Sequence, residues 1–121
     1  MNESEHMPII EKYAFGSMRL GGRTYYADLT ISGGEVARWW REESHLLQPT
    51  DIDAILALKP NVLIIGTGRS GGMRVSDEAK RLCEEIGVEL IIEHTARAIE
   101  RYNAIVLEGN RSVAAAFHLT C

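Results

Sequence analysis

The residues whose types and spacing could do chemistry lie in a glycine-rich loop that follows an apolar stretch. Residues 66–71 read Gly-Thr-Gly-Arg-Ser-Gly, directly after the apolar run 62–65, and they match the dinucleotide fingerprint G-x-G-x-x-G. Glycines let backbone N–H groups approach a phosphate, and Arg69 and Arg74 would add positive charge there. The loop is therefore a candidate site for a ligand that carries phosphate.

The same loop departs from the known phosphate-binding motifs in its later residues. A dinucleotide fingerprint opens directly into its helix, whereas here residues 72–75 precede the predicted helix start at Ser76. A P-loop would need Lys-Ser or Lys-Thr where Gly72-Met73 stands. The pattern favours a structural turn between strand and helix, and if the loop binds a ligand we expect a small anion rather than a dinucleotide. The residues that would line such a site are Thr67, Gly68, Arg69, Ser70, Gly71, Arg74 and, at the end of the next strand, Glu93.

An enzyme that uses the same loop is the alternative interpretation. Residues 68–72 also spell G-x-S-x-G, the nucleophile elbow of hydrolases, with Ser70 as the nucleophile. Asp77, His94 and His118 follow Ser70 in the chain, but they form no convincing triad order. We therefore expect no catalytic residues and keep a small hydrolase or nucleotide-linked enzyme as the competing class.

The two cysteines provide neither a metal site nor a disulfide framework. Cys83 lies on the apolar face of a helical pattern, where a thiol is usually an inert core residue, and we expect Cys121 to be exposed. His118 and Cys121 would point to opposite faces of a strand, so they do not form a metal pair. We expect no metal and no cofactor.

Length and charge limit the class of protein. The 121 residues fit a single domain spanning 1–121. A net charge of −4 and a pI near 5.5 argue against a nucleic-acid-binding surface. No apolar run approaches the roughly 20 residues that a membrane helix needs, and cysteines without a C-x-x-C motif suit a reducing compartment. We therefore expect a cytoplasmic protein with neither nucleic acid nor membrane as a partner.

The N-terminal half of the sequence has the pattern of β-structure. Residues 1–7 are polar and aperiodic, and we expect them to be a frayed end. Aromatic and β-branched residues indicate strands beginning at Lys12 and spanning 24–31 and 36–41, with glycine pairs at the turns between them. In the last of these strands neighbouring tryptophans face opposite sides, so one should be buried and the other should lie at a rim.

The C-terminal half alternates between helical and strand patterns. The predicted helices span 49–58 with Thr50 as the N-cap, 76–87 with Ala79, Leu82, Cys83 and Ile86 buried, and 95–108 with Thr95 and Gly109 as caps. The third is one continuous helix because its apolar stripe is Ala98, Ile99, Tyr102, Ile105 and Val106. The predicted strands span 62–65, 88–92 and, closing the chain, 112–119.

Ordered motifs along nearly the whole chain resemble a known family. The motifs in the N-terminal half are a glycine turn, Trp40-Arg41 and Gln48-Pro49. Those in the C-terminal half are the run from Val62 to Gly68, Gly87-Val88-Glu89, Thr95-Ala96, Tyr102-Asn103-Ala104, Glu108-Gly109 and Phe117-His118-Leu119-Thr120-Cys121. Together they resemble the adipogenesis-associated Mth-domain family, a domain of unknown function that is related to a mitochondrial assembly factor for respiratory complex I.

The resemblance implies a three-layer α/β domain with flanking helices and a central mixed sheet whose last strand is antiparallel. An N-terminal β-hairpin region would precede that sheet. The resemblance implies no enzyme and supplies no catalytic or cofactor residues. We therefore expect a non-enzymatic binding or assembly-type module, a monomer or homodimer whose partner is an unknown protein or a small anion.

Overall fold

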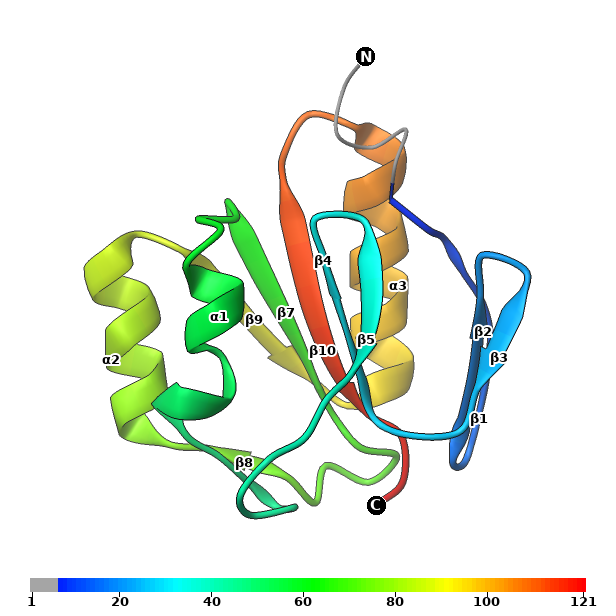
Figure 1. The fold of residues 1–121 in the computed structure, drawn as a ribbon, viewed down its shortest axis with the longest axis horizontal. Coiled ribbons are helices and arrows are strands. Elements are labelled where there is room, and N and C mark those ends of the chain that lie inside the picture. Colours follow the sequence, from blue (N-terminus) through cyan, green and yellow to red (C-terminus); the bar gives the residue numbers. More distant parts are fainter. Residues whose placement is uncertain (1–6) are drawn as a thin grey trace.

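A computed structural model describes residues 7–121 and shows a central mixed sheet flanked by helices (Figure 1). The strands are β1 (Ile10–Ala14), β2 (Ser17–Leu20), β3 (Arg23–Tyr25), β4 (Leu29–Ser32), β5 (Glu35–Arg38), β6 (Leu46–Leu47), β7 (Val62–Thr67), β8 (Arg74–Val75), β9 (Glu89–Glu93) and β10 (Val113–His118). The helices are a 3₁₀ turn η2 (Pro49–Asp51), α1 (Asp53–Leu56), α2 (Asp77–Ile86) and α3 (Thr95–Glu108). The central sheet has the order β5-β4-β10-β7-β9, while β1-β2-β3 and β6-β8 form two small sheets.

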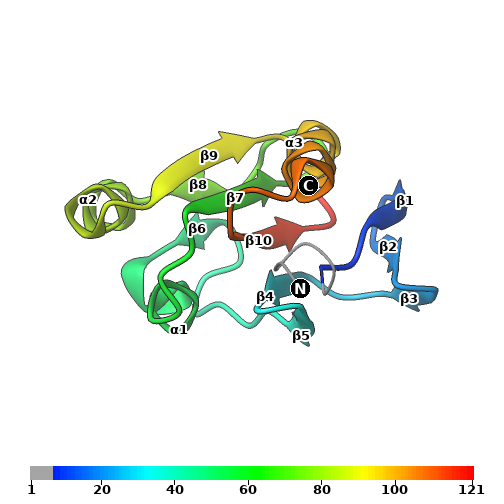
Figure 2. The same ribbon diagram turned by 90° about the horizontal axis from the view of Figure 1, so that it is seen from above.

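Two hydrophobic cores lie on the two faces of the central sheet (Figure 2). Because side chains alternate along a strand, Val62 and Ile64 of β7 join the core under α3 and the β1-β2-β3 sheet. Leu63 and Ile65 join the core under α1 and α2. The expected three-layer α/β architecture, with its mixed sheet and N-terminal hairpin region, is therefore confirmed.

The strand predicted to close the chain is present as β10, but its place in the sheet differs from the expectation. The resemblance implied an antiparallel last strand, whereas β10 is the middle strand, parallel to β7 and antiparallel to β4. All six of its residues are buried. Its three alanines are accommodated because both faces are covered, and they leave room for Tyr102 and Phe117, whose rings meet edge to face with centroids 6.1 Å apart.

The single long helix predicted near the C-terminus is confirmed as α3. Gly109 ends it in the left-handed conformation, with φ of 73°. The predicted N-cap is wrong by one residue: His94 occupies the cap position, and Thr95 is the first helical residue. The Thr95 hydroxyl is instead bonded to a neighbouring strand end and loop, as described below.

The helix α2 begins and ends at the predicted residues. The Ser76 hydroxyl accepts a hydrogen bond from the amide of Ala79, and Gly87 caps the other end with φ of 88°. The predicted apolar face is too wide: Ala79 and Cys83 are buried, Leu82 is half-buried, but Ile86 is 44% exposed because it lies at the last turn, beyond the sheet.

Two other predicted elements are shorter in the structure. The helix expected over 49–58 is the turn η2 followed by α1, and Gln48 rather than Thr50 precedes it, with the Gln48 amide donating to the Asp51 carboxylate at 2.7 Å. The strand expected over 24–31 is divided between β3 and β4, because the chain passes here from one sheet to another. Within residues 7–121, no helix is long and apolar enough to cross a membrane.

The tryptophan pair behaves as predicted although its strand ends early. β5 stops at Arg38, and Trp39 is 6% exposed whereas Trp40 is 76% exposed. The expectation of a frayed N-terminus falls on residues 1–6, which lie outside the described residues, and on Met7, which has no regular structure.

The burial of the two thiols leads to a labelling prediction. Burial raises the pKa of the Cys83 thiol, and its side chain lies in the core beside α2, whereas Cys121 is exposed. A neutral alkylating reagent should modify Cys121 first and leave Cys83 unmodified in the folded protein. Peptide mass spectrometry over time checks this, and early modification of Cys83 would contradict its place in the core.

Candidate functional site

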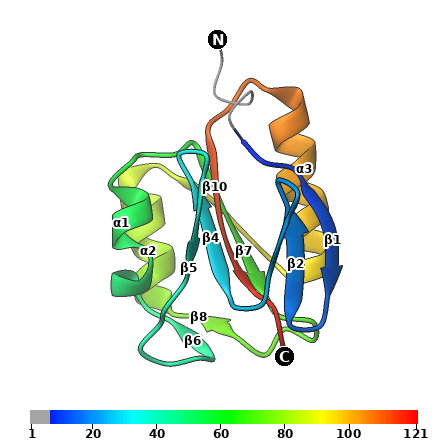
Figure 3. The ribbon, with the colours of Figure 1, turned by 45° about the vertical axis from the view of Figure 1, so that its right-hand side comes forward.

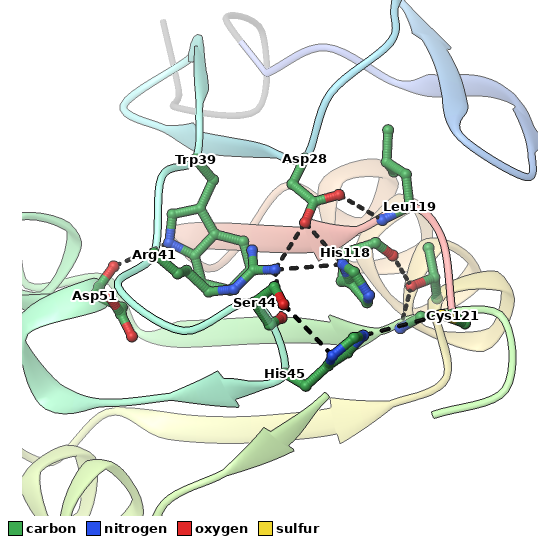
Figure 4. A network of polar contacts seen from close by, with 11 residues as sticks. Asp28, Trp39, Arg41, Ser44, His45, Asp51, His118, Leu119 and Cys121 are labelled. Carbon is green, nitrogen blue, oxygen red and sulfur yellow. Dashed lines mark hydrogen bonds and ion pairs between the residues drawn. The ribbon is translucent and has the colours of Figure 1, made fainter. Parts of the chain in front are cut away.

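A largely buried polar cluster joins residues at the start of β4, after β5 and at the end of β10 (Figure 4). The carboxylate of Asp28, just before β4, accepts hydrogen bonds from Arg41 Nη2 at 2.8 Å and from the backbone amide of Leu119 at 2.8 Å. The same carboxylate lies 2.7 Å from Nδ1 of His118, the last residue of β10. We call Asp28, Arg41 and His118 the Asp28 cluster.

Arg41 is fixed by its surroundings as well as by Asp28. Its guanidinium lies over the Trp39 ring, 4.3 Å from the ring centroid, and donates to the Ser44 carbonyl at 2.7 Å. Trp39 is itself anchored, since its indole N–H donates to the Asp51 carbonyl at 3.0 Å. The guanidinium of Arg41 is therefore held by Trp39 and Ser44 as well as by Asp28.

The hydrogen bonds of the cluster indicate which of its groups carry a proton. Burial would raise the pKa of the Asp28 carboxyl, but hydrogen bonds from His118, from the Leu119 amide and from Arg41 outweigh burial, so the pKa is lowered. An ionised carboxylate can only accept, so His118 Nδ1 carries a proton toward Asp28. Three buried atoms then have no partner within residues 7–121, namely His118 Nε2 and Arg41 Nε and Nη1.

The Thr95 hydroxyl connects the Asp28 cluster to the glycine loop. It donates to the His118 carbonyl at 2.6 Å and accepts from the Gly68 amide at 2.8 Å. Gly68 in turn accepts at its carbonyl from the Thr95 amide at 3.0 Å. The first residue of α3 therefore holds the loop against the end of β10.

The amides of the glycine loop bind the chain itself. Arg69 N–H donates to the Thr120 carbonyl at 2.7 Å, and Gly72 N–H donates to the Cys121 carbonyl at 2.7 Å. These are the groups that a phosphate cradle would use. The favoured interpretation of the loop as a structural turn gains a physical reason, because the loop binds Thr120 and Cys121, next to the end of β10 (Figure 3).

The glycines are needed for close packing at the same place. A Cβ at Gly66 would lie 2.7 Å from Phe117 Cδ1, and one at Gly72 would lie 2.0 Å from the Cys121 carbonyl oxygen. Gly68 also has φ of 108°, a conformation that side chains rarely adopt. The glycines of the fingerprint therefore allow the loop to pack closely against Phe117 and Cys121.

A cavity of about 620 Å³ lies beside this loop, at the carboxyl ends of the parallel strands β7 and β9. We call it the β7–β9 cleft. Its lining residues are Thr67, Gly71, Met73, Arg74, Val75, Asp77, Lys80, Ile92, Glu93 and His94. The position is the one where open α/β sheets place ligands.

Four of the seven predicted site residues line this cleft and three do not. Thr67, Gly71, Arg74 and Glu93 line it. Gly68, Arg69 and Ser70 lie outside its lining. Burial raises the pKa of the Tyr13 phenol, and the positive charge of Arg69 acts to lower it. The two arginines of the loop therefore do not meet at one site.

The charges of the cleft are unevenly compensated. Glu93 is paired with Arg101, with 3.2 Å between carboxylate oxygen and guanidinium nitrogen. Within residues 7–121, Arg74 and Lys80 form no ion pair. The sequence did not single out Lys80, although it lies one helical turn after the Ser76 cap and so faces the same end of α2.

The hydrolase alternative finds no assembled triad in the described part of the chain. Ser70 is exposed and has no hydrogen bond to a histidine or carboxylate there. His118 is bound to Asp28 rather than to Asp77. Clusters of three or more metal-ligating side chains are also absent between residues 7 and 121.

Asp28 was not predicted as a site residue, because it lies inside what was expected to be one strand. A signal for its partners was present, because the motifs Trp40-Arg41 and Phe117-His118 carried the family resemblance. Because Arg41 and His118 are 77 residues apart in the chain, local sequence patterns could not predict the contact between them.

The fold is that of a small α/β domain with a mixed central sheet and a glycine loop whose amides bind carbonyl groups of the same chain. Residues 10–118 match the family described as a protein of unknown function, DUF498/DUF598, and the chain belongs to that family. The chain is 28% identical to PH1505 from Pyrococcus horikoshii OT3, with a TM-score of 0.84 over 93% of this chain and 98% of that one. It is equally 28% identical to MT938, with a TM-score of 0.81 over 94% and 99%.

A more distant structure shares the fold. A Mth938-like domain protein from Bordetella pertussis is 20% identical, with a TM-score of 0.68 over 94% of this chain and 87% of that one. The expected Mth-type fold is thus found among the relatives, which carry no assigned activity in their names.

The Asp28 cluster leads to a prediction on stability and pH. Asp28→Asn keeps the size of the side chain but leaves Arg41 without its counter-charge, so the free energy of unfolding at neutral pH should fall by about 3 kcal/mol. The pKa of Asp28 is lower in the folded chain, so its stabilisation is complete above the unfolded pKa of about 4 and is lost as pH falls through the lower folded value. Urea unfolding across this range should show the two proteins converging in acid.

The control for this variant is Glu84→Gln, an equivalent change at an exposed position of α2 that has no ion pair in the described residues. It should change stability by no more than about 0.5 kcal/mol. An Asp28→Asn protein as stable as this control would refute the role given to the carboxylate.

The structural role of the loop is tested by Gly66→Ala. Its new methyl group would crowd Phe117 and the Thr95 hydroxyl, which a Cβ would approach to 2.9 Å, so the unliganded protein should lose about 1–3 kcal/mol of stability. Thermal unfolding in buffer without phosphate measures this. Unchanged stability would mean that the glycine is not required by packing.

Proposed function

We propose that this protein is a small cytoplasmic binding module, without catalytic turnover, that holds a small anion in the β7–β9 cleft. The observation that carries the proposal is the pair of cationic side chains, Arg74 and Lys80, that line the cleft and have no ion-pair partner within residues 7–121. An unpaired guanidinium and ammonium group at one cavity favour a ligand with acceptor oxygens.

The other charges of the cleft limit the ligand. Glu93 is offset by Arg101, but Asp77, at the first turn of α2, has no ion-pair partner within residues 7–121. The imidazole of His94 lies against Gly71, since a Cβ on that glycine would be 2.5 Å from His94 Nε2, and it adds a ring nitrogen to the same wall. The balance is weakly positive, which suits one phosphate-sized group better than a chain of phosphates.

The state of the backbone supports the same preference. The loop amides of Gly68, Arg69 and Gly72 are engaged by Thr95, Thr120 and Cys121, so binding would rest on side chains rather than on an amide cradle. A dinucleotide would need that cradle for its pyrophosphate. A small anion needs only the two cations.

A protein partner belongs to the same proposal. The resemblance to an adipogenesis-associated family, one relative of which assists the assembly of respiratory complex I, supports an assembly-type role in which the anion site is part of the contact. The module would act as a monomer or homodimer. A small hydrolase or nucleotide-linked enzyme is the competing class, and it would need a base for Ser70 that the described residues do not supply.

Calorimetry with inorganic phosphate and with sulfate tests the cleft. The wild type should bind, and Arg74→Gln or Lys80→Gln should each weaken binding about tenfold, because each removes one charge-assisted hydrogen bond. Asp77→Asn, which removes the opposing charge, should strengthen binding a few-fold.

Two arginine variants serve as matched controls. Arg97→Gln changes an exposed residue of α3 that pairs with Glu100, and Arg69→Gln changes the loop arginine that lies outside the cleft. Both should bind phosphate as the wild type does. Tight binding of NAD, or loss of phosphate binding in the controls alone, would be incompatible with the proposed site.

A further inference from the structure

A second cavity, of about 480 Å³, shares Arg74 with the β7–β9 cleft. Its lining residues are Glu43, Ser44, His45, Leu46, Gly72 and Arg74. Arg74 is the one residue that the two linings share, and its amide donates to the His45 carbonyl at 2.9 Å. The lining of this cavity differs in kind from that of the cleft, because it includes the imidazole of His45, which has a thiol beside it.

The thiol is that of Cys121. Its sulfur lies 3.9 Å from His45 Nε2, and the opposite ring nitrogen of His45 lies 3.4 Å from the Ser44 hydroxyl. The backbone carbonyl of Cys121 accepts from the amide of Gly72, which lines the cavity, so Cys121 lies next to that lining. It is also exposed, unlike Cys83.

His118 provides an independent sign that a further group belongs at this place. Its side chain is only 5% exposed, and Nε2 has no partner within residues 7–121. Figure 4 shows the ring directed toward His45 and Cys121, and the two imidazoles meet edge to face with centroids 5.4 Å apart. A buried polar atom without a partner is costly. A polar group attached to the Cys121 sulfur would supply one.

We propose that Cys121 is a nucleophilic thiol that captures small disulfides carrying carboxylates, with His45 as its base and Arg74 as the group that attracts the carboxylate. His45 Nε2 takes the thiol proton, and the thiolate attacks one sulfur of the disulfide. The S–S bond of the incoming molecule breaks as the new S–S bond to Cys121 forms, and the departing thiolate regains the proton from His45. The product is a mixed disulfide plus one free small thiol.

The charge of the electrophile makes the site distinguishable from an ordinary exposed thiol. Arg74 forms no ion pair in the described residues, so it raises the local concentration of an anionic reagent but not that of a neutral one. Proton removal by His45 helps both reagents equally. Loss of Arg74 should therefore change the ratio of the rates with the anionic and the neutral reagent, whereas loss of His45 should lower both rates.

The experiment compares the rate of release of the chromophoric thiol from two disulfides, the anionic dithiobis-nitrobenzoate and the neutral dithiodipyridine. The ratio of the two rates for the native protein is divided by the ratio for the same protein unfolded in urea. That quotient should be about fivefold or more in the wild type and close to unity in Arg74→Gln. His45→Gln should slow both reactions about tenfold or more while leaving the quotient unchanged.

Control variants separate this inference from the proposed function. Cys121→Ser reports the small contribution of Cys83, and Lys80→Gln should lose phosphate affinity in the cleft while its thiol reacts as in the wild type. A wild-type quotient of unity, or an Arg74→Gln protein that keeps the wild-type quotient, overturns the role of Arg74. A His45→Gln protein that reacts at the wild-type rate overturns the role of the base.

Discussion

The arrangement of the candidate site depends on the hydrogen bonds that the carboxylate of Asp28 accepts. This carboxylate joins residues that are 13, 90 and 91 positions away in the chain, through Arg41, His118 and the Leu119 amide. Arg41 follows β5, His118 is the last residue of β10, and Asp28 itself precedes β4, so one side chain links the start of β4 to the ends of β5 and β10. The arrangement is stable only while all members are present, since a buried charge without its partner costs several kcal/mol.

The constraint extends to the glycine loop through a single hydroxyl. Thr95 binds the His118 carbonyl at the end of β10 and the Gly68 amide of the loop, so it fixes one relative to the other. The loop then holds Thr120 and Cys121 by the amides of Arg69 and Gly72. The geometry of both cavities beside the loop, the β7–β9 cleft and the one next to Cys121, therefore depends on a buried cluster that lines neither of them.

The sequence predicted those parts of the fold that depend on local periodicity. The stripe of α3, the caps of α2 and the buried run of β7 are properties of short segments, and they were found within a residue or two. The neighbours of β10 could not be predicted in this way, because pairing between β4, β7 and β10 depends on contacts across tens of residues. A chain pattern shows that a strand is buried on both faces, but not which strands lie beside it.

The candidate site was predicted in part for the same reason. The cleft lies where parallel strands end, which the order of strand, loop and helix indicates, and Thr67, Gly71, Arg74 and Glu93 reach it. The absence of Arg69 from the cleft lining and the use of the loop amides were not predictable, because those amides are bound by Thr120 and Cys121, which come from a distant segment. Glycines at the positions of a phosphate-binding motif allow another group to approach the backbone closely. Here that group is the peptide segment of Thr120 and Cys121.

The central place of β10 sets the order in which the domain can be completed. The strand pairs that it makes are the ones that join the two halves of the sheet, β5-β4 on one side and β7-β9 on the other. During synthesis from the N-terminus, the β5-β4 half is made first and the β7-β9 half is complete in sequence at residue 93. Each half keeps an open inner edge until β10 is made. Sheet closure must wait for the last strand in the described chain, so the nascent protein is most exposed to wrong pairing just before β10 is made.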